Sequence, residues 1–377
     1  MRIDRPPMGW NSWNTFGNDI SEDLILKTAD VMADEGLLDA GYKYLVIDDC
    51  WSLKERDKDG RLVPDPEKFP HGMKYLADYI HGKGLKFGMY SCAGTQTCAG
   101  YPGSFEHEFT DAATFAGWGV DYLKYDYCYH SPIIPGKYLY RRMGLALANC
   151  GRDILFAACS WGSDETQEWI KTTGASIWRS TGDIFDTWQS VKDLANRQDA
   201  LLPYNGHGCF NDMDMLIVGM HGKGNVGLSG CSDVQYRTHF SLWAFMGSPL
   251  MIGCDIRNMD DVTRQTLTNR ELIRINQDGW YSQPFALTPM MIQSGVKIYA
   301  KLLENGDVAV GCFNMEDTKT TARFNIDEIG LPVSTGKTLQ MREVWSGQET
   351  APREGTVFWD LEPYGCAVFR CRLTDLA

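Results

Sequence analysis

Short apolar segments alternate with helical patterns through most of this 377-residue chain, and this alternation constrains its fold more than any other feature. Between residue 8 and about residue 275, segments that fit buried strands occur eight times. These segments are residues 8–13, 44–47, 85–90, 121–128, 154–159, 176–181, 210–216 and 249–255. Eight strand and helix units without an additional edge-strand signal predict an α/β fold, a closed parallel (β/α)8 TIM barrel.

Helical patterns fill the stretches between these strands. They cover residues 19–36, 71–82, 104–116, 137–149, 167–171, 186–197 and 232–246. The main alternative is an open doubly wound sheet that binds a dinucleotide, which requires a GxGxxG turn after the first strand. The first turn reads WNSWNTFGND instead, so the barrel is favoured.

The pattern changes beyond residue 275. Residues 296–302 and 308–313 flank an Asn305-Gly306 turn and predict a hairpin. Further strand patterns occur at residues 320–325, 341–344, 357–361 and 367–373. We therefore expect a barrel over residues 1–280 and a small C-terminal antiparallel β-sandwich over residues 281–377. No low-complexity linker separates them, which predicts that the two domains are docked.

Charge and hydropathy exclude several classes of partner. The formal charge of −13 disfavours nucleic acid and anionic membranes, which would be repelled. No apolar run approaches the roughly 20 residues that span a bilayer. A neutral or cationic ligand fits better; the oligomeric state is not readable from the sequence.

The cysteines and the N-terminal residues lead to an expectation about the compartment. Twelve cysteines are spread along the chain without a CxxC pair, so neither a zinc site nor a compact disulfide framework is indicated. Arg2, Asp4 and Arg5 interrupt any apolar leader, and no Asn-x-Ser/Thr site is present. These features predict a cytoplasmic protein of bacterial origin.

Polar and aromatic residues follow the predicted strands where a barrel carries its active site. Five are carboxylates, two are cations and three are aromatic. They are Trp13, Asp48, Asp49, Tyr90, Lys124, Asp126, Trp161, Arg179, Asp183 and Asp214. Any one of these acids could form an ordinary cap or salt bridge, but five acids in one cavity need a positive or hydroxyl-rich occupant.

Two kinds of occupant would satisfy the acids. A divalent metal would accept Asp48, Asp49 and Asp214 as ligands, but cations lie among the acids and no histidine contributes. A sugar offers hydroxyl groups to the carboxylates, an apolar face to Trp13 and Trp161, and a positively charged transition state. We therefore favour a sugar and expect neither a metal nor a cofactor, with a metal-dependent lyase or isomerase as the alternative.

Glycoside hydrolysis requires two carboxyl groups, one ionised and one protonated. Lys124 and Asp126 are two residues apart on one strand, so both point to the same side. This predicts that the ammonium lowers the pKa of Asp126 and makes it a nucleophile. A buried ion pair that only holds the strand in register would give the same sequence pattern. Asp183 is followed by Ile184 and Phe185, and such an apolar setting would raise its pKa and suit a general acid.

The strand-end segments resemble a known family. MGWNSWNTF, YLVIDDCW, FGMYS, YLKYDYC, CSWG, RSTGDI, NDMDML and SPLMIGCDIR are similar, in this order, to the signatures of glycoside hydrolase family 27, which contains α-galactosidases and α-N-acetylgalactosaminidases. The resemblance covers roughly residues 6–280. It implies a retaining mechanism through a covalent glycosyl-enzyme, with Asp126 as the nucleophile and Asp183 as the acid/base.

The resemblance also implies roles for other residues. Cys98 and Cys128 match a pair that is disulfide-bonded in secreted relatives. The remaining matched positions bind the terminal sugar, and the two consecutive acids among them read its 4- and 6-hydroxyls. These positions are Trp13, Asp48, Asp49, Tyr90, Lys124, Arg179 and Asp214.

The expected substrate is a terminal, non-reducing α-D-galactosyl residue of an oligosaccharide of the melibiose or raffinose type. The first alternative is an α-N-acetylgalactosaminidase, because the small residues Ser160 and Ser163 match positions that read the 2-substituent of the sugar. An arabinopyranosidase is disfavoured because Asp48 and Asp49 are both retained. An alternative of another class is a non-catalytic sugar-binding barrel.

Overall fold

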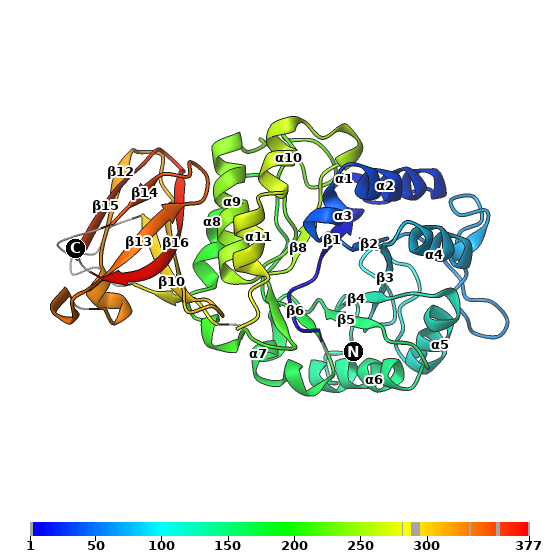
Figure 1. The fold of residues 1–377 in the computed structure, drawn as a ribbon. Coiled ribbons are helices and arrows are strands. Elements are labelled where there is room, and N and C mark those ends of the chain that lie inside the picture. The colour runs from blue at the N-terminus through cyan, green and yellow to red at the C-terminus, as the bar shows by residue number, and fades with distance from the viewer. Residues whose placement is uncertain (1–2, 281, 288–294, 332, 352–354, 376–377) are drawn as a thin grey trace.

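A computed structural model describes residues 3–280, 282–287, 295–331, 333–351 and 355–375. Its first part is a ring of eight parallel strands surrounded by helices, the predicted barrel (Figure 1). The strands are β1 Met8–Asn11, β2 Tyr44–Val46, β3 Lys86–Cys92, β4 Tyr122–Asp126, β5 Leu155–Ala158, β6 Ile177–Arg179, β7 Phe210–Asp212 and β8 Leu250–Ile252.

Neighbours in the ring follow the order β7-β6-β5-β4-β3-β2-β1-β8. A parallel bridge between Leu216 and Ile252 joins the two ends of this order and closes the barrel. Side chains that alternate along the strands fill its interior, among them Val46, Tyr122 and Leu155. The barrel is therefore a packed core with its polar residues at one end.

The helices differ from the predicted ranges mainly in their ends. α2 begins at Glu22, after the capping residue Ser21, and the predicted helix 104–116 is found at 108–118. The predicted helix at 167–171 contains only one short α-helical turn. The helices are α1 Trp13–Phe16, α2 Glu22–Asp34, α3 Leu37–Ala40, α4 Gly72–Gly82, α5 Glu108–Trp118, α6 Gly136–Ala148, α7 Thr166–Trp169, α8 Trp188–Arg197, α9 Asp233–Met246, α10 Asp261–Leu267 and α11 Arg270–Asn276. Within the described residues, no helix combines the length and the apolar character needed to cross a bilayer.

The C-terminal part is an antiparallel β-sandwich. One sheet has the order β14-β13-β16-β11-β10-β9, and β12 pairs with β15 in the other. Apolar residues of both sheets, such as Phe324 and Phe369, form the core between them. The strands are β9 Phe285–Ala286, β10 Val296–Leu302, β11 Val308–Asn314, β12 Thr320–Asn325, β13 Lys337–Glu343, β14 Glu349–Thr350, β15 Thr356–Leu361 and β16 Cys366–Asp375.

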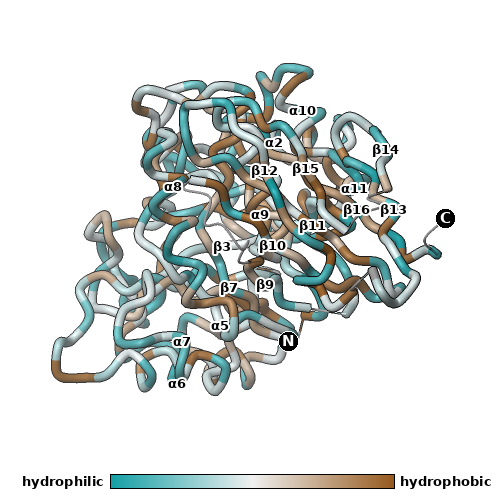
Figure 2. The backbone as a smooth tube through the Cα atoms, turned by 90° about the vertical axis from the view of Figure 1, so that its left-hand side faces the viewer, coloured by the Kyte–Doolittle hydropathy of each residue, from teal (hydrophilic) through white to brown (hydrophobic). Residues whose placement is uncertain are grey.

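Helix α9 lies between the barrel and the sandwich. Most of its residues are buried, and Figure 2 shows the apolar stretch along it. It contacts β11 and β16, and the rings of Phe245 and Phe313 meet edge to face with centroids 6.1 Å apart. The hydroxyl of Thr238 also donates to the carbonyl of Tyr364 at 2.6 Å. One hydrophobic core therefore continues from the barrel into the sandwich.

Replacing Phe313 by Ala tests this continuity. The ring is fully buried, so its removal leaves a cavity in the contact between the domains. We expect the free energy of unfolding to fall by about 3–5 kcal/mol, measured by urea denaturation. Phe358→Ala is the matched control, because this phenylalanine of the sandwich is 62% exposed; its substitution should change stability by less than about 0.5 kcal/mol. Equal effects of the two substitutions would contradict the shared core.

Candidate active site

A narrow cavity opens at the carboxyl ends of the barrel strands and gathers most of the residues that the sequence indicated. All ten strand-end residues line it, and so does Cys98. Sequence reasoning missed three other lining residues, Asn14, Met215 and Val226. Asn14 lies inside the WNSWNTF segment and Met215 directly follows Asp214, so their positions next to strand ends could have indicated them.

Asp48, which is buried, and Lys124, which is partly buried, form an ion pair across β3, the strand that lies between theirs. The ammonium of Lys124 is 2.7 Å from the Asp48 carboxylate, which also accepts from the Asn11 amide at 2.8 Å. Burial alone would lower the pKa of Lys124, but Asp48 and neighbouring anions outweigh it and raise this pKa well above its ordinary value. Lys124 therefore carries a fixed positive charge at the base of the cavity.

Asp49 is held by backbone donors from two segments. Its carboxylate accepts from the amide of Cys50 at 2.7 Å and from the amide of Ala99 at 2.9 Å. Burial raises the pKa of Asp49, and these hydrogen bonds act in the opposite direction. The loop after β3 is thus fixed against the end of β2, with both acids of the Asp48-Asp49 pair facing the cavity.

Asp126 ends β4 and is almost completely buried. Its carboxylate accepts hydrogen bonds from the Tyr90 hydroxyl and from the Tyr127 amide, both at 2.9 Å. Burial raises the pKa of Asp126 to about 6, although Lys124 and the two hydrogen bonds lower it. The expectation of a low pKa was wrong, because Lys124 is paired with Asp48 and burial has the larger effect on Asp126.

Arg179 connects two acids from neighbouring strand ends. One of its terminal nitrogens lies 2.8 Å from Asp183 and 2.6 Å from Asp214. Burial raises the pKa of Asp214 to about 6, against the effect of Arg179. The side chain of Asp183 is 61% exposed, while Ile184 is buried away from it. The predicted apolar setting of Asp183 is therefore wrong: its carboxylate is polar, exposed and held by one guanidinium.

The segment after β5 turns sharply at Trp161. Its backbone has a φ of +56°, a conformation that residues other than glycine rarely adopt. This turn places the indole of Trp161 at the cavity. Ser160 does not line the cavity; it is buried, and its hydroxyl lies 2.6 Å from that of Thr166. The carbonyl of Ser163 accepts from the same Thr166 hydroxyl. Neither serine hydroxyl is among the groups that line the pocket.

Cys98 and Cys128 are joined by a disulfide with their Cα atoms 5.1 Å apart. It links the loop after β3 to the loop after β4, directly beside Asp126. The Tyr90 hydroxyl contacts both the Asp126 carboxylate and the sulfur of Cys98. Cys98, Cys128 and Asp126 are also the group among the described residues whose atoms could hold a metal, but the disulfide removes both thiolates that such a site would need.

Two family models match the chain. The model described as alpha galactosidase A matches residues 5–278, and the model of the alpha galactosidase C-terminal beta sandwich domain matches residues 293–371. An alpha-galactosidase of Cyamopsis tetragonoloba is 42% identical over 365 residues, which cover 97% of this chain and 85% of that protein.

Solved structures give the same result. A putative alpha-galactosidase of Bacteroides fragilis superposes with a TM-score of 0.92 at 40% identity, covering 98% of this chain and 80% of that one. An alpha-galactosidase of Saccharomyces cerevisiae, solved with raffinose, superposes with a TM-score of 0.90 at 30% identity, covering 98% of each chain.

The buried charge of Asp126 leads to a prediction about stability. Because its pKa is about 6 in the folded protein and about 3.8 when unfolded, the folded state binds more protons between these values. Above pH 6 the folded protein therefore carries an unfavourable buried charge. Asp126→Asn should raise the free energy of unfolding by roughly 1–3 kcal/mol at pH 8. This gain should be almost unchanged at pH 6, and most of it should be lost between pH 6 and pH 4, where the folded state takes up the proton before the unfolded state does. Chemical denaturation at pH 8, 6 and 4 measures it.

Asp48→Asn is the matched control, because it leaves the partly buried Lys124 without its ion-pair partner. This variant should be destabilised at pH 8. A pH-independent effect of Asp126→Asn, or destabilisation by it at pH 8, would contradict the assigned electrostatics.

Proposed function

The chain belongs to glycoside hydrolase family 27, the α-galactosidase family, and on that premise we propose how its acidic cavity performs the reaction. The activity is hydrolysis of terminal, non-reducing α-D-galactosyl residues with retention at the anomeric carbon. The observation that carries the residue assignment is that two carboxyl groups in opposite environments, Asp126 buried and Asp183 exposed, line one cavity.

Asp126 acts as the nucleophile. Its carboxylate is ionised above pH 6, and its low hydration leaves the lone pairs available to attack the anomeric carbon. Tyr90 orients the attacking group through its hydroxyl, which remains protonated because burial, and then Asp126, raises the pKa of Tyr90 well above its ordinary value. The product of this step is a covalent galactosyl ester on Asp126.

Asp183 acts as the acid and then as the base. Its exposed carboxyl group faces the mouth of the cavity, where the leaving group departs and water enters. It donates a proton to the glycosidic oxygen in the first step and takes one from water in the second. Arg179 fixes the position of the carboxyl group through the contact at 2.8 Å.

The other acids bind the sugar. Asp48, Asp49 and Asp214 present carboxylate oxygens to ring hydroxyls, with the Asp48-Asp49 pair at the 4- and 6-positions as the family resemblance implies. Together they also stabilise the positive charge that develops on the ring in the transition state. Trp13 and Trp161 cover the apolar face of the sugar ring. Two carboxyl groups and water complete this chemistry.

The raffinose complex of the Saccharomyces cerevisiae relative supports raffinose-type oligosaccharides as substrates.

The alternative of an α-N-acetylgalactosaminidase depended on small residues near the sugar 2-position. Neither serine lines the cavity: the Ser160 hydroxyl pairs with that of Thr166, and Ser163 contacts Thr166 only through its backbone carbonyl. No observation therefore favours this alternative. A panel of aryl α-galactoside, its 2-acetamido analogue and aryl β-L-arabinopyranoside tests the choice, and the highest kcat/KM should be for the galactoside. Faster turnover of either other substrate would overturn it.

The compartment is a separate proposal. The disulfide indicates an oxidising environment, such as the periplasm or the cell exterior. This opposes the cytoplasmic location that the sequence suggested. The redox state of Cys98 and Cys128 in protein taken from its source cells, read by thiol alkylation and mass spectrometry, distinguishes the two.

Asp126→Asn should abolish turnover of aryl α-galactosides, lowering kcat by at least about 10³-fold, because an amide cannot form the covalent ester. Galactose binding measured by calorimetry should remain, since the amide retains the shape of the carboxylate. Turnover by this variant near the wild-type rate would exclude Asp126 as the nucleophile. If the wild-type protein bound galactose but hydrolysed no aryl α-galactoside, the result would instead support the non-catalytic sugar-binding barrel.

Asp183→Asn should have an effect that depends on the leaving group. A dinitrophenyl galactoside needs little protonation, so its first step should be almost unchanged, whereas hydrolysis of melibiose should fall by about 10²–10⁴-fold. Steady-state and burst kinetics on the two substrates measure the difference. Equal losses on both would contradict the assignment of Asp183 as the acid.

A further inference from the structure

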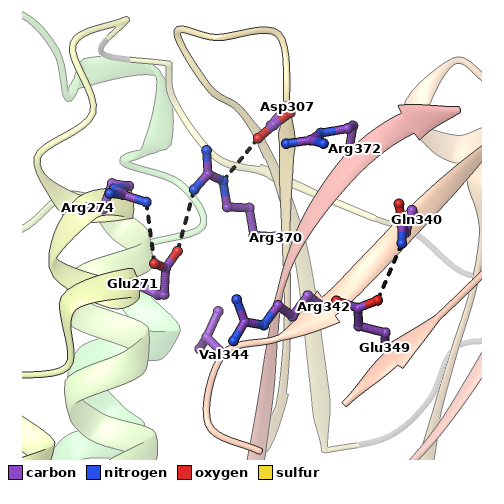
Figure 3. A pocket seen from close by; sticks show the side chains of 9 residues that line it. All are labelled: Glu271, Arg274, Asp307, Gln340, Arg342, Val344, Glu349, Arg370 and Arg372. Atoms are coloured by element: carbon purple, nitrogen blue, oxygen red, sulfur yellow. Dashed lines mark hydrogen bonds and ion pairs between the residues drawn. The ribbon is translucent and has the colours of Figure 1, made fainter. Parts of the chain in front are cut away.

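We propose that a second binding site, for a small oxyanion such as phosphate or a carboxylate, lies between helix α11 of the barrel and the sandwich. A cavity of about 350 Å³ is present there and shares no lining residue with the acidic cavity (Figure 3). Four arginines surround it: Arg274 from α11, Arg342 from β13, and Arg370 and Arg372 from β16. This inference does not rest on the proposed function.

The strand register brings these arginines together on one face of the sheet. β13 and β16 are antiparallel, with Arg342 directly opposite Arg370 and Gln340 directly opposite Arg372. Arg370 and Arg372 are two residues apart and so point to the same side. Like charges directly opposite each other on a sheet are destabilising. Arg342 has the acid Glu349 opposite it on β14, but the Arg342–Arg370 pair works against the sheet, and a ligand with negative charge would relieve this repulsion.

Neighbouring acids neutralise only part of the positive charge. Arg370 lies 3.0 Å from Asp307 and 3.5 Å from Glu271, and Glu271 is also 3.3 Å from Arg274. The Asp307 carboxylate additionally accepts a hydrogen bond from the side-chain amide of Asn305 at 2.8 Å. Both acids are thus already shared between two donors.

Arg342 and Arg372 are the two arginines of the cavity whose charges are not neutralised by an ion pair with any described residue. The third acid of the cavity, Glu349, lies directly opposite Arg342 in the strand register, but it accepts its hydrogen bond from Gln340, at 3.3 Å. Over the part of the chain that the structure describes, neither the Arg342 nor the Arg372 guanidinium has an ion pair or a hydrogen bond of its own. Both side chains are exposed and line the cavity. Two free guanidinium groups therefore adjoin one cavity, in a protein whose formal charge is −13.

The chemistry of these groups defines the ligand. A guanidinium is planar and donates two parallel hydrogen bonds to the oxygens of a carboxylate or phosphate. The volume is at the lower end of the range for small-molecule sites, about 300–1,000 Å³, and Val344 gives the wall an apolar part. A bound oxyanion would contact strands of the sandwich beside α11, so binding should stabilise the docked domains.

Titration calorimetry of the full chain with inorganic phosphate, and separately with malonate, tests the site. Ionic strength is held constant with sodium chloride, because screening alone changes weak anion binding. We expect saturable binding by wild type and an increase in melting temperature as the ion is added. The double variant Arg342→Gln/Arg372→Gln should lose at least about tenfold in affinity, as expected for the loss of charged hydrogen bonds.

Arg141→Gln is the matched control. It removes one positive charge, as Arg372→Gln does, at an exposed arginine of α6 that hydrogen-bonds to Thr172. This variant should bind like wild type. Arg372→Gln alone should give an intermediate loss, and it preserves the test if the double variant folds poorly. Binding of phosphate alone identifies a tetrahedral ligand, and binding of malonate alone identifies a carboxylate. No saturable binding of either ion, or equal binding by the double variant and wild type, would overturn the proposal.

Discussion

The burial of more carboxylates than cations at one end of the barrel is the constraint on which the rest of the site depends. Lys124 is committed to Asp48, and Arg179 is divided between Asp183 and Asp214. Asp126 is left with two neutral donors, the Tyr90 hydroxyl and the Tyr127 amide. Its ionised form is therefore poorly stabilised, which makes the folded protein less stable at neutral pH; under the proposed function, the same lack of stabilisation makes Asp126 a reactive nucleophile.

The positions of the site residues could be predicted from the sequence because a parallel barrel brings every strand end to one face. Asp48, Asp126 and Asp214 are far apart in the chain, yet a reading of eight strands was sufficient to group them. Their partners could not be predicted in the same way. Lys124 is two residues from Asp126, but its side chain reaches across β3 to Asp48. Which acid Lys124 pairs with depends on distances between strands in the folded protein, and the alternation of side chains along one strand does not predict these distances.

Loop conformation was the other limit of the prediction. Asp183 was expected to share the apolar surroundings of Ile184, whereas the turn buries Ile184 and exposes Asp183. Ser160 was expected at the sugar, whereas the turn at Trp161 directs it toward Thr166. In both segments adjacent side chains point in opposite directions, and no periodic pattern reports which one faces the cavity. The short edge strands β9 and β14 were also missed, because two residues carry no alternation.

The disulfide between Cys98 and Cys128 encloses α5 and β4 in a covalent ring, with Asp126 just inside one of its ends. A protease that cuts a surface loop within this ring would produce two fragments that stay joined through sulfur. The strand that carries Asp126 would also keep its hydrogen-bonded neighbours β3 and β5. A nicked molecule of this kind would run as two bands on a reducing gel while its acidic cavity remained assembled.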